Sequence, residues 1–260
     1  MEEEEFFTEK ELRRLFRLTT HGKKRILLER DREEEEVFEE VFDKRTMMTL
    51  YEIVKKKVIY RLDGAIGSGK ESKIFHGIDY NGNEVAVKIF LTTTAEFKKR
   101  LPYILGDKRF EGGKRGGYFL IKLWARKEYV NLQSAYDNGV SVPKPIIVLN
   151  NVLVMEFIGK DGKRAPLLSE VKPTKTDYIR VIRMIRRLYL KARLVHADLS
   201  EHNIFKWGSK IYFFDFGSAV ESGHPNATEF LYRDVRNVNR FFLKNGIQVW
   251  DEDRVLKGVI

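Results

Sequence analysis

Two short segments in the last third of the chain hold acidic and amide side chains at fixed spacing. The first reads His196-Ala-Asp198-Leu-Ser-Glu-His-Asn203, and the second, which starts twelve residues after Asn203, reads Asp215-Phe-Gly. Phosphoryl transfer needs a carboxylate at the attacking oxygen, and it needs oxygen ligands for the magnesium that bridges the phosphates. Asp198 is therefore the predicted base or orienting group, while Asn203 and Asp215 are the predicted metal ligands. Each motif alone is common by chance, but the two in this order are specific. His196 is expected to pack the loop.

A glycine-rich turn precedes a second candidate group, the lysine of Val-Ala-Val-Lys88. Residues 64–70 match the spacing of a Walker A loop, which requires Ser or Thr next and then a helix. Here Glu71 follows, and residues 73–80 have the pattern of a strand, so the context contradicts a Walker A loop. A strand, a glycine loop and a strand ending in Lys88 instead fit the flap over the ATP phosphates of kinases. The predicted nucleotide-binding residues of this region are Gly67, Ser68, Gly69, Lys70 and Lys88.

Lys88 needs a carboxylate partner, because a cation on a flexible stem is poorly positioned until it is paired. Glu128, in a predicted helix, is the candidate; alternatively it is a surface residue paired with a neighbouring lysine at helical spacing. The apolar segment Val152–Gly159 fits the hinge that meets the adenine base. Met155 would line the pocket, and the backbones of Glu156 and Ile158 would contact the base edge, although alone this segment would be an ordinary buried strand.

The periodicity of the chain changes near residue 61 and again near residue 156. Helical spacing of apolar residues predicts helices within 1–60, and a glycine-rich basic stretch predicts a mobile loop at 106–117. The predicted strands are 73–80, 84–90, 146–149 and 152–155, and the predicted later helices are 118–137, 177–193 and 228–243. Strands come first and helices second, so we expect an α+β, two-lobed fold. Its predicted parts are a helical extension (1–60), an N-terminal lobe (61–155) and a C-terminal lobe (156–260).

The charge of the chain is positive and unevenly distributed. The formal net charge is +10, and residues 98–127 hold ten basic residues against two acidic ones. A basic excess suits polyanions, but a solvated, ion-paired surface of a heat-adapted protein is an equal alternative. Cysteine is absent, which excludes disulfides and thiolate chemistry. The acidic start of the chain and the lack of a long apolar stretch predict a cytoplasmic protein without a membrane anchor.

Several segments of this sequence resemble the RIO kinases, and among them the Rio-one branch. The resemblance covers about residues 43–246 and includes the glycine loop, the hinge and the catalytic segment. His224–Asp234 and Asn237–Phe242 are similar to the last helix of the family. One departure lies after Asp215, where the chain reads Phe-Gly-Ser-Ala and the family usually has Val-Ser-Gln or similar residues. Asp215 itself is retained, so the departure concerns the shape of the loop.

The resemblance implies a truncated kinase fold that binds ATP and Mg²⁺, with Mn²⁺ as an alternative ion. It further implies autophosphorylation on serine, with the chain itself as phosphoacceptor, and an ATPase role with the small ribosomal subunit precursor and its rRNA as partners. In the family's proposed cycle the aspartate matching Asp215 becomes transiently phosphorylated. The sequence independently predicts a C-terminal lobe without an activation loop or peptide-docking helices, since no Ala-Pro-Glu follows Asp215.

Two other functions fit the same residues. A small-molecule kinase of the aminoglycoside type shares the His-x-Asp-x4-Asn motif, although the helix beside the catalytic loop is basic here. The second is a ribonucleoprotein-binding module in which ATP sets the conformation and little turnover occurs. Its working surface would be residues 98–127 and the basic stripe formed by Arg180, Arg183, Arg187 and Lys191.

Overall fold

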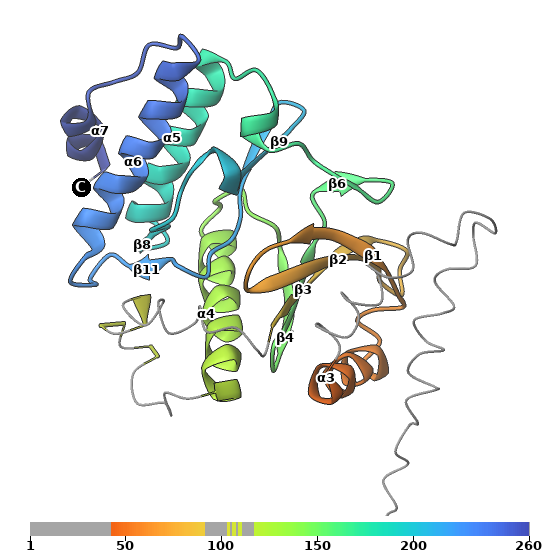
Figure 1. The fold of residues 1–260 in the computed structure, drawn as a ribbon. Helices are drawn as coiled ribbons and strands as arrows, with labels where there is room; N and C mark the ends of the chain where they lie inside the picture. The colour runs from red at the N-terminus through yellow and green to blue at the C-terminus, as the bar shows by residue number, and fades with distance from the viewer. Residues whose placement is uncertain (1–42, 92–102, 105, 108, 111–116, 260) are drawn as a thin grey trace, which may run out of the picture.

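The structure is a computed structural model that describes residues 43–91, 103–104, 106–107, 109–110 and 117–259 (Figure 1). The helices predicted before residue 43 lie outside the described residues, as does most of the basic stretch between 92 and 116. Among the described helices, none is long and apolar enough to cross a membrane.

An antiparallel sheet of five strands forms the first lobe, in the order β1-β2-β3-β5-β4. Its strands are β1 (Arg61–Ser68), β2 (Ser72–Ile78), β3 (Glu84–Phe90), β4 (Pro145–Leu149) and β5 (Val152–Glu156). The four predicted strands are thus confirmed to within two residues at each end. The prediction that residues 64–70 do not form a Walker A loop is also confirmed, because the glycine turn joins two paired strands and no helix follows it.

Both faces of this sheet are covered, which explains why β3 is buried almost throughout. Successive side chains of a strand point to opposite faces. Val85, Val87 and Ile89 therefore pack on one face with the helix α3 (Lys44–Lys55), through Leu50 and Ile53 among others. Ala86 and Phe90 belong to the core on the other face. Lys88 lies between these two residues, two positions from each, and so faces the same side of the sheet.

The helix α3 is fixed to the sheet lobe by polar contacts as well as by its apolar side. The carboxylate of Asp43 caps the helix by accepting the N–H of Thr46 at 2.8 Å. The side-chain amide of Asn151, in the turn between β4 and β5, donates to Thr46 Oγ1 at 2.8 Å and to the carbonyl of Phe90 at 3.0 Å. Helical periodicity was predicted up to about residue 60, but the helix ends earlier, at Lys55. The chain then turns toward β1 at Lys57, whose φ is 58°.

The long helix α4 (Gly117–Asp137) lies between the sheet and the helices of the second lobe (Figure 1). Its buried residues, among them Trp124 and Leu132, join Ala86 and Met155 of the sheet to the second lobe in one apolar core. The helices of that lobe are α5 (Lys175–Leu190), α6 (Ala227–Lys244) and α7 (Glu252–Val259). The predicted helices at 118–137, 177–193 and 228–243 are confirmed, whereas α7 was not predicted.

Short strands and turns connect these helices and position the candidate site. They are β6 (Gly159–Lys160), β7 (Lys163–Arg164), η2 (Leu168–Glu170), β8 (Leu194–Val195), η3 (Glu201–Asn203), β9 (Ile204–Trp207), β10 (Lys210–Phe213) and β11 (Val220–Glu221). β6 pairs with β7, β9 with β10, and β8 with β11. The predicted catalytic segment thus leaves β8, and the hairpin β9–β10 returns the chain to Asp215.

Candidate active site

A cleft of about 420 Å³ lies where the glycine turn, the hinge and the segment at Asp215 meet. Its volume is in the range typical of sites for small ligands. Most of the predicted site residues line it, namely the nucleotide-binding candidates Gly67, Ser68, Gly69, Lys88, Glu128, Met155, Glu156 and Ile158 and the metal-ligand candidate Asp215. Lys70, Asp198 and Asn203 do not line it. Lys70 is exposed in the turn between β1 and β2, and the other two lie in the loop beside Asp215.

Lys88 lies at the back of the cleft between two carboxylates. Its Nζ donates to both oxygens of Glu128, at 2.8 and 2.7 Å, and to Oδ1 of Asp215 at 2.9 Å. Burial alone would lower the pKa of Lys88, but the negative charges of Asp215 and Glu128 raise it above its ordinary value. The predicted pairing with Glu128 is therefore present, and the ammonium group stays charged at the place where phosphates would enter.

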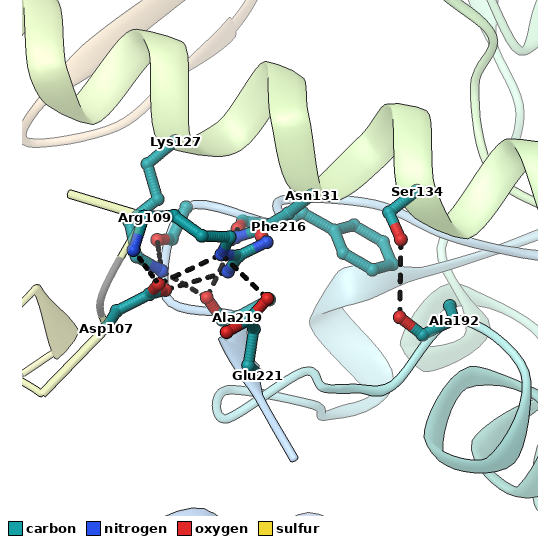
Figure 2. A network of polar contacts seen from close by, with 10 residues as sticks. Asp107, Arg109, Lys127, Asn131, Ser134, Ala192, Phe216, Ala219 and Glu221 are labelled. Carbon is teal, nitrogen blue, oxygen red and sulfur yellow. Dashed lines mark hydrogen bonds and ion pairs between the residues drawn. The ribbon is translucent and has the colours of Figure 1, made fainter. Parts of the chain in front are cut away.

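The segment after Asp215 is held by side chains of α4 (Figure 2). The buried ammonium of Lys127 donates to the carbonyls of Gly217 and Ala219, and the amide of Asn131 donates to those of Phe216 and Ala219. Asp215 itself has a φ of 63°, a left-handed conformation that costs about 1–3 kcal/mol and persists only when its surroundings enforce it. These contacts supply that enforcement.

Gly217 is required at its position by close packing. A Cβ atom added there would lie 2.8 Å from the indole nitrogen of Trp124 on α4. The Phe-Gly sequence after Asp215 thus matches a site where the backbone passes directly against the helix. Neither Lys127 nor Asn131 was predicted, because in the sequence both look like ordinary polar positions of a helix.

The loop that carries Asp198 is fixed by a buried carboxylate from α6. Asp234 accepts the N–H of Ala197 at 2.8 Å and that of Leu199 at 2.9 Å, on either side of Asp198. Ala197 has a φ of 65°, and Asn203 Nδ2 closes the loop by donating to the carbonyl of Asp198 at 2.7 Å. Burial raises the pKa of Asp234 to about 7, despite the two backbone hydrogen bonds. The prediction did not assign a role to Asp234.

His196 is buried and does not face the cleft. Its Nε2 lies 3.0 Å from the carbonyl of Phe214, so it donates to that oxygen, and its ring packs on Phe216 at 4.8 Å between centroids. Burial lowers the pKa of His196 to about 4. A neutral, buried ring that joins the loop to the strand before Asp215 agrees with the expected structural role.

The hinge offers defined backbone groups to a base. The N–H of Glu156 donates to the carbonyl of Lys144 at 2.8 Å, and the carbonyl of Ile158 accepts from Ala165 at 2.8 Å. A base would therefore contact the carbonyl of Glu156 and the N–H of Ile158. The side chain of Met155 lines the cleft beside them.

The described part of the segment predicted as a mobile loop is packed against the second lobe. Asp107 is buried, and its carboxylate accepts two hydrogen bonds from the Arg109 guanidinium, at 2.9 and 2.7 Å (Figure 2). Arg109 also lies 3.3 Å from Glu221 on β11. Arg109 is thus engaged inside the protein, while the remaining cations of this loop lie outside the described residues.

Comparison with known proteins agrees with these features. The family model of the RIO domain matches residues 73–255. A protein of Caenorhabditis elegans named serine/threonine-protein kinase RIO1 is 37% identical over 237 residues, which cover 89% of this chain and 47% of that protein. The RIO-type serine/threonine-protein kinase Rio1 of Haloferax volcanii is 41% identical over 219 residues, covering 84% of this chain and 75% of the relative.

A solved structure shows the same similarity. The crystal structure of the Rio2 kinase–ADP/Mg²⁺–phosphoaspartate complex from Chaetomium thermophilum matches with a TM-score of 0.63 and 25% identity, over 82% of this chain and 66% of that one. The chain spans less than half of the length of the relatives from Caenorhabditis elegans, Homo sapiens and Dictyostelium discoideum.

Proposed function

Because the chain belongs to the RIO domain family and has a truncated kinase-like fold, we propose that it is an atypical serine/threonine kinase that uses ATP. The observation that carries this proposal is the position of Lys88, which is held by Glu128 and Asp215 at the back of a cleft roofed by the glycine turn. Catalysis of phosphoryl transfer depends chiefly on positioning and on neutralising phosphate charge, and this arrangement provides both. The part of the second lobe that follows Asp215, residues 216–259, consists of β11, α6 and α7.

The residues beside Lys88 fit a magnesium site. Mg²⁺ in kinases is bound by one or two protein oxygens together with the phosphates of the substrate. Among the described residues, no group of three or more His, Cys, Asp or Glu side chains is arranged to hold a metal ion by itself. Asn203 uses its amide nitrogen on the carbonyl of Asp198, so its Oδ1 is left for a cation next to Asp215. A bound Mg²⁺ would supply positive charge to neutralise the phosphates.

Asp198 and Asp215 have separate proposed roles. Asp198 is exposed on a loop whose flanking N–H groups are fixed by Asp234, so it can orient a hydroxyl or water and accept its proton. For Asp215 we propose a second role as transient phosphoacceptor: a carboxylate oxygen attacks the γ-phosphorus, the bond to ADP breaks, and water later hydrolyses the acyl-phosphate. The phosphoaspartate named for the related Rio2 kinase supports this step.

The cellular role proposed here is that of an autophosphorylating ATPase in maturation of the small ribosomal subunit. Its support is the family relationship and the formal charge of +10, which suits an rRNA partner. The phosphoacceptors in this proposal are the chain itself, Asp215 and water.

The test of kinase activity is transfer of the γ-phosphate in the protein with Lys88→Ala. Label transfer and ATP hydrolysis should fall by at least about a hundredfold, since a preorganised positive charge is lost from the phosphates. Lys55→Ala, an exposed lysine on α3, is the matched control and should behave as the wild type. Equal activity of the Lys88→Ala and Lys55→Ala proteins would refute the proposed site.

A further inference from the structure

A basic groove lies along α5 in the second lobe. It encloses about 780 Å³ and is called the α5 groove below. Its uncharged lining residues come from α5, from the segment after α4 and from the β9–β10 hairpin: Gly139, Ser141, Met184, Leu190, Ser209 and Ile211. The remaining lining residues are all basic: Arg180, Arg183, Arg186, Arg187, Lys191 and Lys210. None of the described residues that line the groove is acidic.

The amphipathic pattern of α5 produces this charge. Tyr178, Val181, Ile185 and others bury one face of the helix, so the arginines are placed together on the opposite face. Like charges three or four residues apart destabilise a helix by about 0.2–0.5 kcal/mol per pair. The lining of the α5 groove offers no acidic side chain to offset this cost, which favours an anionic partner from outside.

Contacts within the protein engage only some of the six basic side chains of the α5 groove. Arg180 lies 3.8 Å from Asp177, and Arg187 donates to the carbonyl of Gly139 at 2.7 Å. In the part of the chain that the structure describes, Arg183, Arg186, Lys191 and Lys210 have no ion-pair partner. Of these, Arg183 and Arg186 are exposed on α5, and Lys191 is exposed at the C-cap of the same helix.

We propose that the α5 groove binds the phosphate backbone of double-helical RNA. Arginine presents a planar fork that matches phosphate oxygens, and four of the six cations are arginines. From Arg180 to Lys191 the stripe spans roughly 16 Å along the helix. That length allows the stripe to contact more than one phosphate group of a duplex.

The composition of the groove selects among nucleic acids. Proteins that bind unpaired strands stack the bases on aromatic side chains. No aromatic residue is among the described residues that line the α5 groove. Recognition is therefore expected to depend on the backbone of a paired region and to be insensitive to base sequence.

RNA and nucleotide can be bound at the same time. The α5 groove and the ATP cleft share no lining residue. They are connected by β10, which starts at Lys210 in the groove and ends at Phe213, two residues before Asp215. This inference deepens the proposed function by assigning a surface to its RNA partner, but it does not depend on phosphoryl transfer.

The test compares RNA binding of the full chain and of the triple variant Arg183→Gln, Arg186→Gln and Lys191→Gln. The probe is an RNA hairpin of arbitrary sequence, titrated without nucleotide at several salt concentrations. The slope of log K against log salt should become shallower by about two to three units, and the affinity at moderate salt should fall at least roughly tenfold. Label transfer from ATP should stay at the wild-type level, which separates this result from a failure of the kinase proposal.

A variant of the other lobe provides the matched control. Lys55→Gln, Lys56→Gln and Lys57→Gln remove the same charge from exposed positions at the end of α3 and should leave the slope unchanged. The proposal is overturned if the α5 variant keeps the wild-type slope or if the control loses as much affinity. It is equally overturned if an unpaired RNA strand or polyglutamate binds the wild-type protein as tightly as the hairpin.

Discussion

At the scale of single residues, the acidic groups around Lys88 differ in what they contact. Glu128 is buried and accepts from the lysine with both carboxylate oxygens, whereas Asp215 contacts the same lysine from a partly exposed position. Asp198 is exposed and does not line the cleft. Removal of a carboxylate that holds a cation should therefore affect a different step from removal of a carboxylate that orients the acceptor.

We expect Asp198→Asn and Asp215→Asn to separate binding from transfer. Asp198→Asn should lower turnover by about a hundredfold or more and leave Mg²⁺-dependent ATP affinity unchanged, because its role is to orient the acceptor. Asp215→Asn should weaken that affinity, because a charged metal ligand is lost. It should also abolish label that hydroxylamine releases from acid-quenched protein. Hydroxylamine-sensitive label that persists in Asp215→Asn would exclude an acyl-phosphate at this residue.

His196 should make the stability of the protein depend on pH. Burial lowers its pKa to about 4, whereas an unfolded histidine titrates near 6.5. Between these values the unfolded chain binds a proton that the folded chain does not, so stability is present above about pH 6.5 and is lost as the pH falls toward 4. The loss attributable to this ring is roughly 3 kcal/mol at most.

Denaturant unfolding at a series of pH values measures this effect. His196→Gln, which keeps a donor for the carbonyl of Phe214, should be less stable at neutral pH but should lose less stability on acidification. His202→Gln removes an exposed histidine and serves as the control, with an acid response equal to that of the wild type. An unchanged acid response in His196→Gln would contradict the assignment.

At the scale of elements, the helix α6 positions the catalytic loop through one side chain. Ionised Asp234 can accept the N–H groups of Ala197 and Leu199 with equal strength, while its protonated form holds one of them poorly. Because burial raises the pKa of Asp234 to about 7, the folded protein gains the proton near neutrality. Activity should therefore rise with pH through about 7.

Kinetics of Asp234→Asn test this role. We expect kcat to fall by tenfold to a hundredfold with unchanged ATP affinity, since small displacements of a catalytic loop have effects of this size. The acidic limb of the pH profile near 7 should disappear, because the amide does not titrate. Glu229→Gln, an exposed acid on the same helix, should retain the wild-type profile. A limb near pH 7 that survives in Asp234→Asn would assign the titration to another group.

The helices and strands differ in how well the sequence predicts them. Strand β3 has the predicted bounds, and α4 begins one residue earlier than predicted, because strong periodicity and clear turn residues determine both. The roles of Asp234, Lys127 and Asn131 were not predicted, since each acts on backbone groups far away in the sequence. Local spacing carries no information about such contacts. The helix α7 was missed for the same reason, because it packs on α5 and α6, with Val255 in the shared core.

At the scale of the whole molecule, the two lobes share their apolar interior through the sheet. One face of β3 and β5 packs with α3, and the opposite face packs with α4 and the helices of the second lobe. A strand such as β5 thus contributes Val154 to one cluster and Met155 to the other. Neither cluster can open fully while the other keeps the sheet intact.

We therefore expect residues 43–259 to unfold in one transition, even though chains of this size often unfold in steps. Ile53→Ala in α3 and Leu188→Ala in α5 each remove a buried side chain, and each should cost about 2–5 kcal/mol. Both should lower the same midpoint by roughly 5–15 °C in scanning calorimetry, with the calorimetric and van't Hoff enthalpies in agreement. Leu243→Ala, which truncates an exposed apolar side chain of α6, provides the matched control and should leave the midpoint nearly unchanged. If the two lobes instead unfold independently, two transitions will appear, and Ile53→Ala will shift only the transition of the sheet lobe.

Because β3 and β5 couple the two lobes, either substitution should also destabilise the catalytic cleft. Stabilisation by ATP should therefore appear as a shift of the single peak.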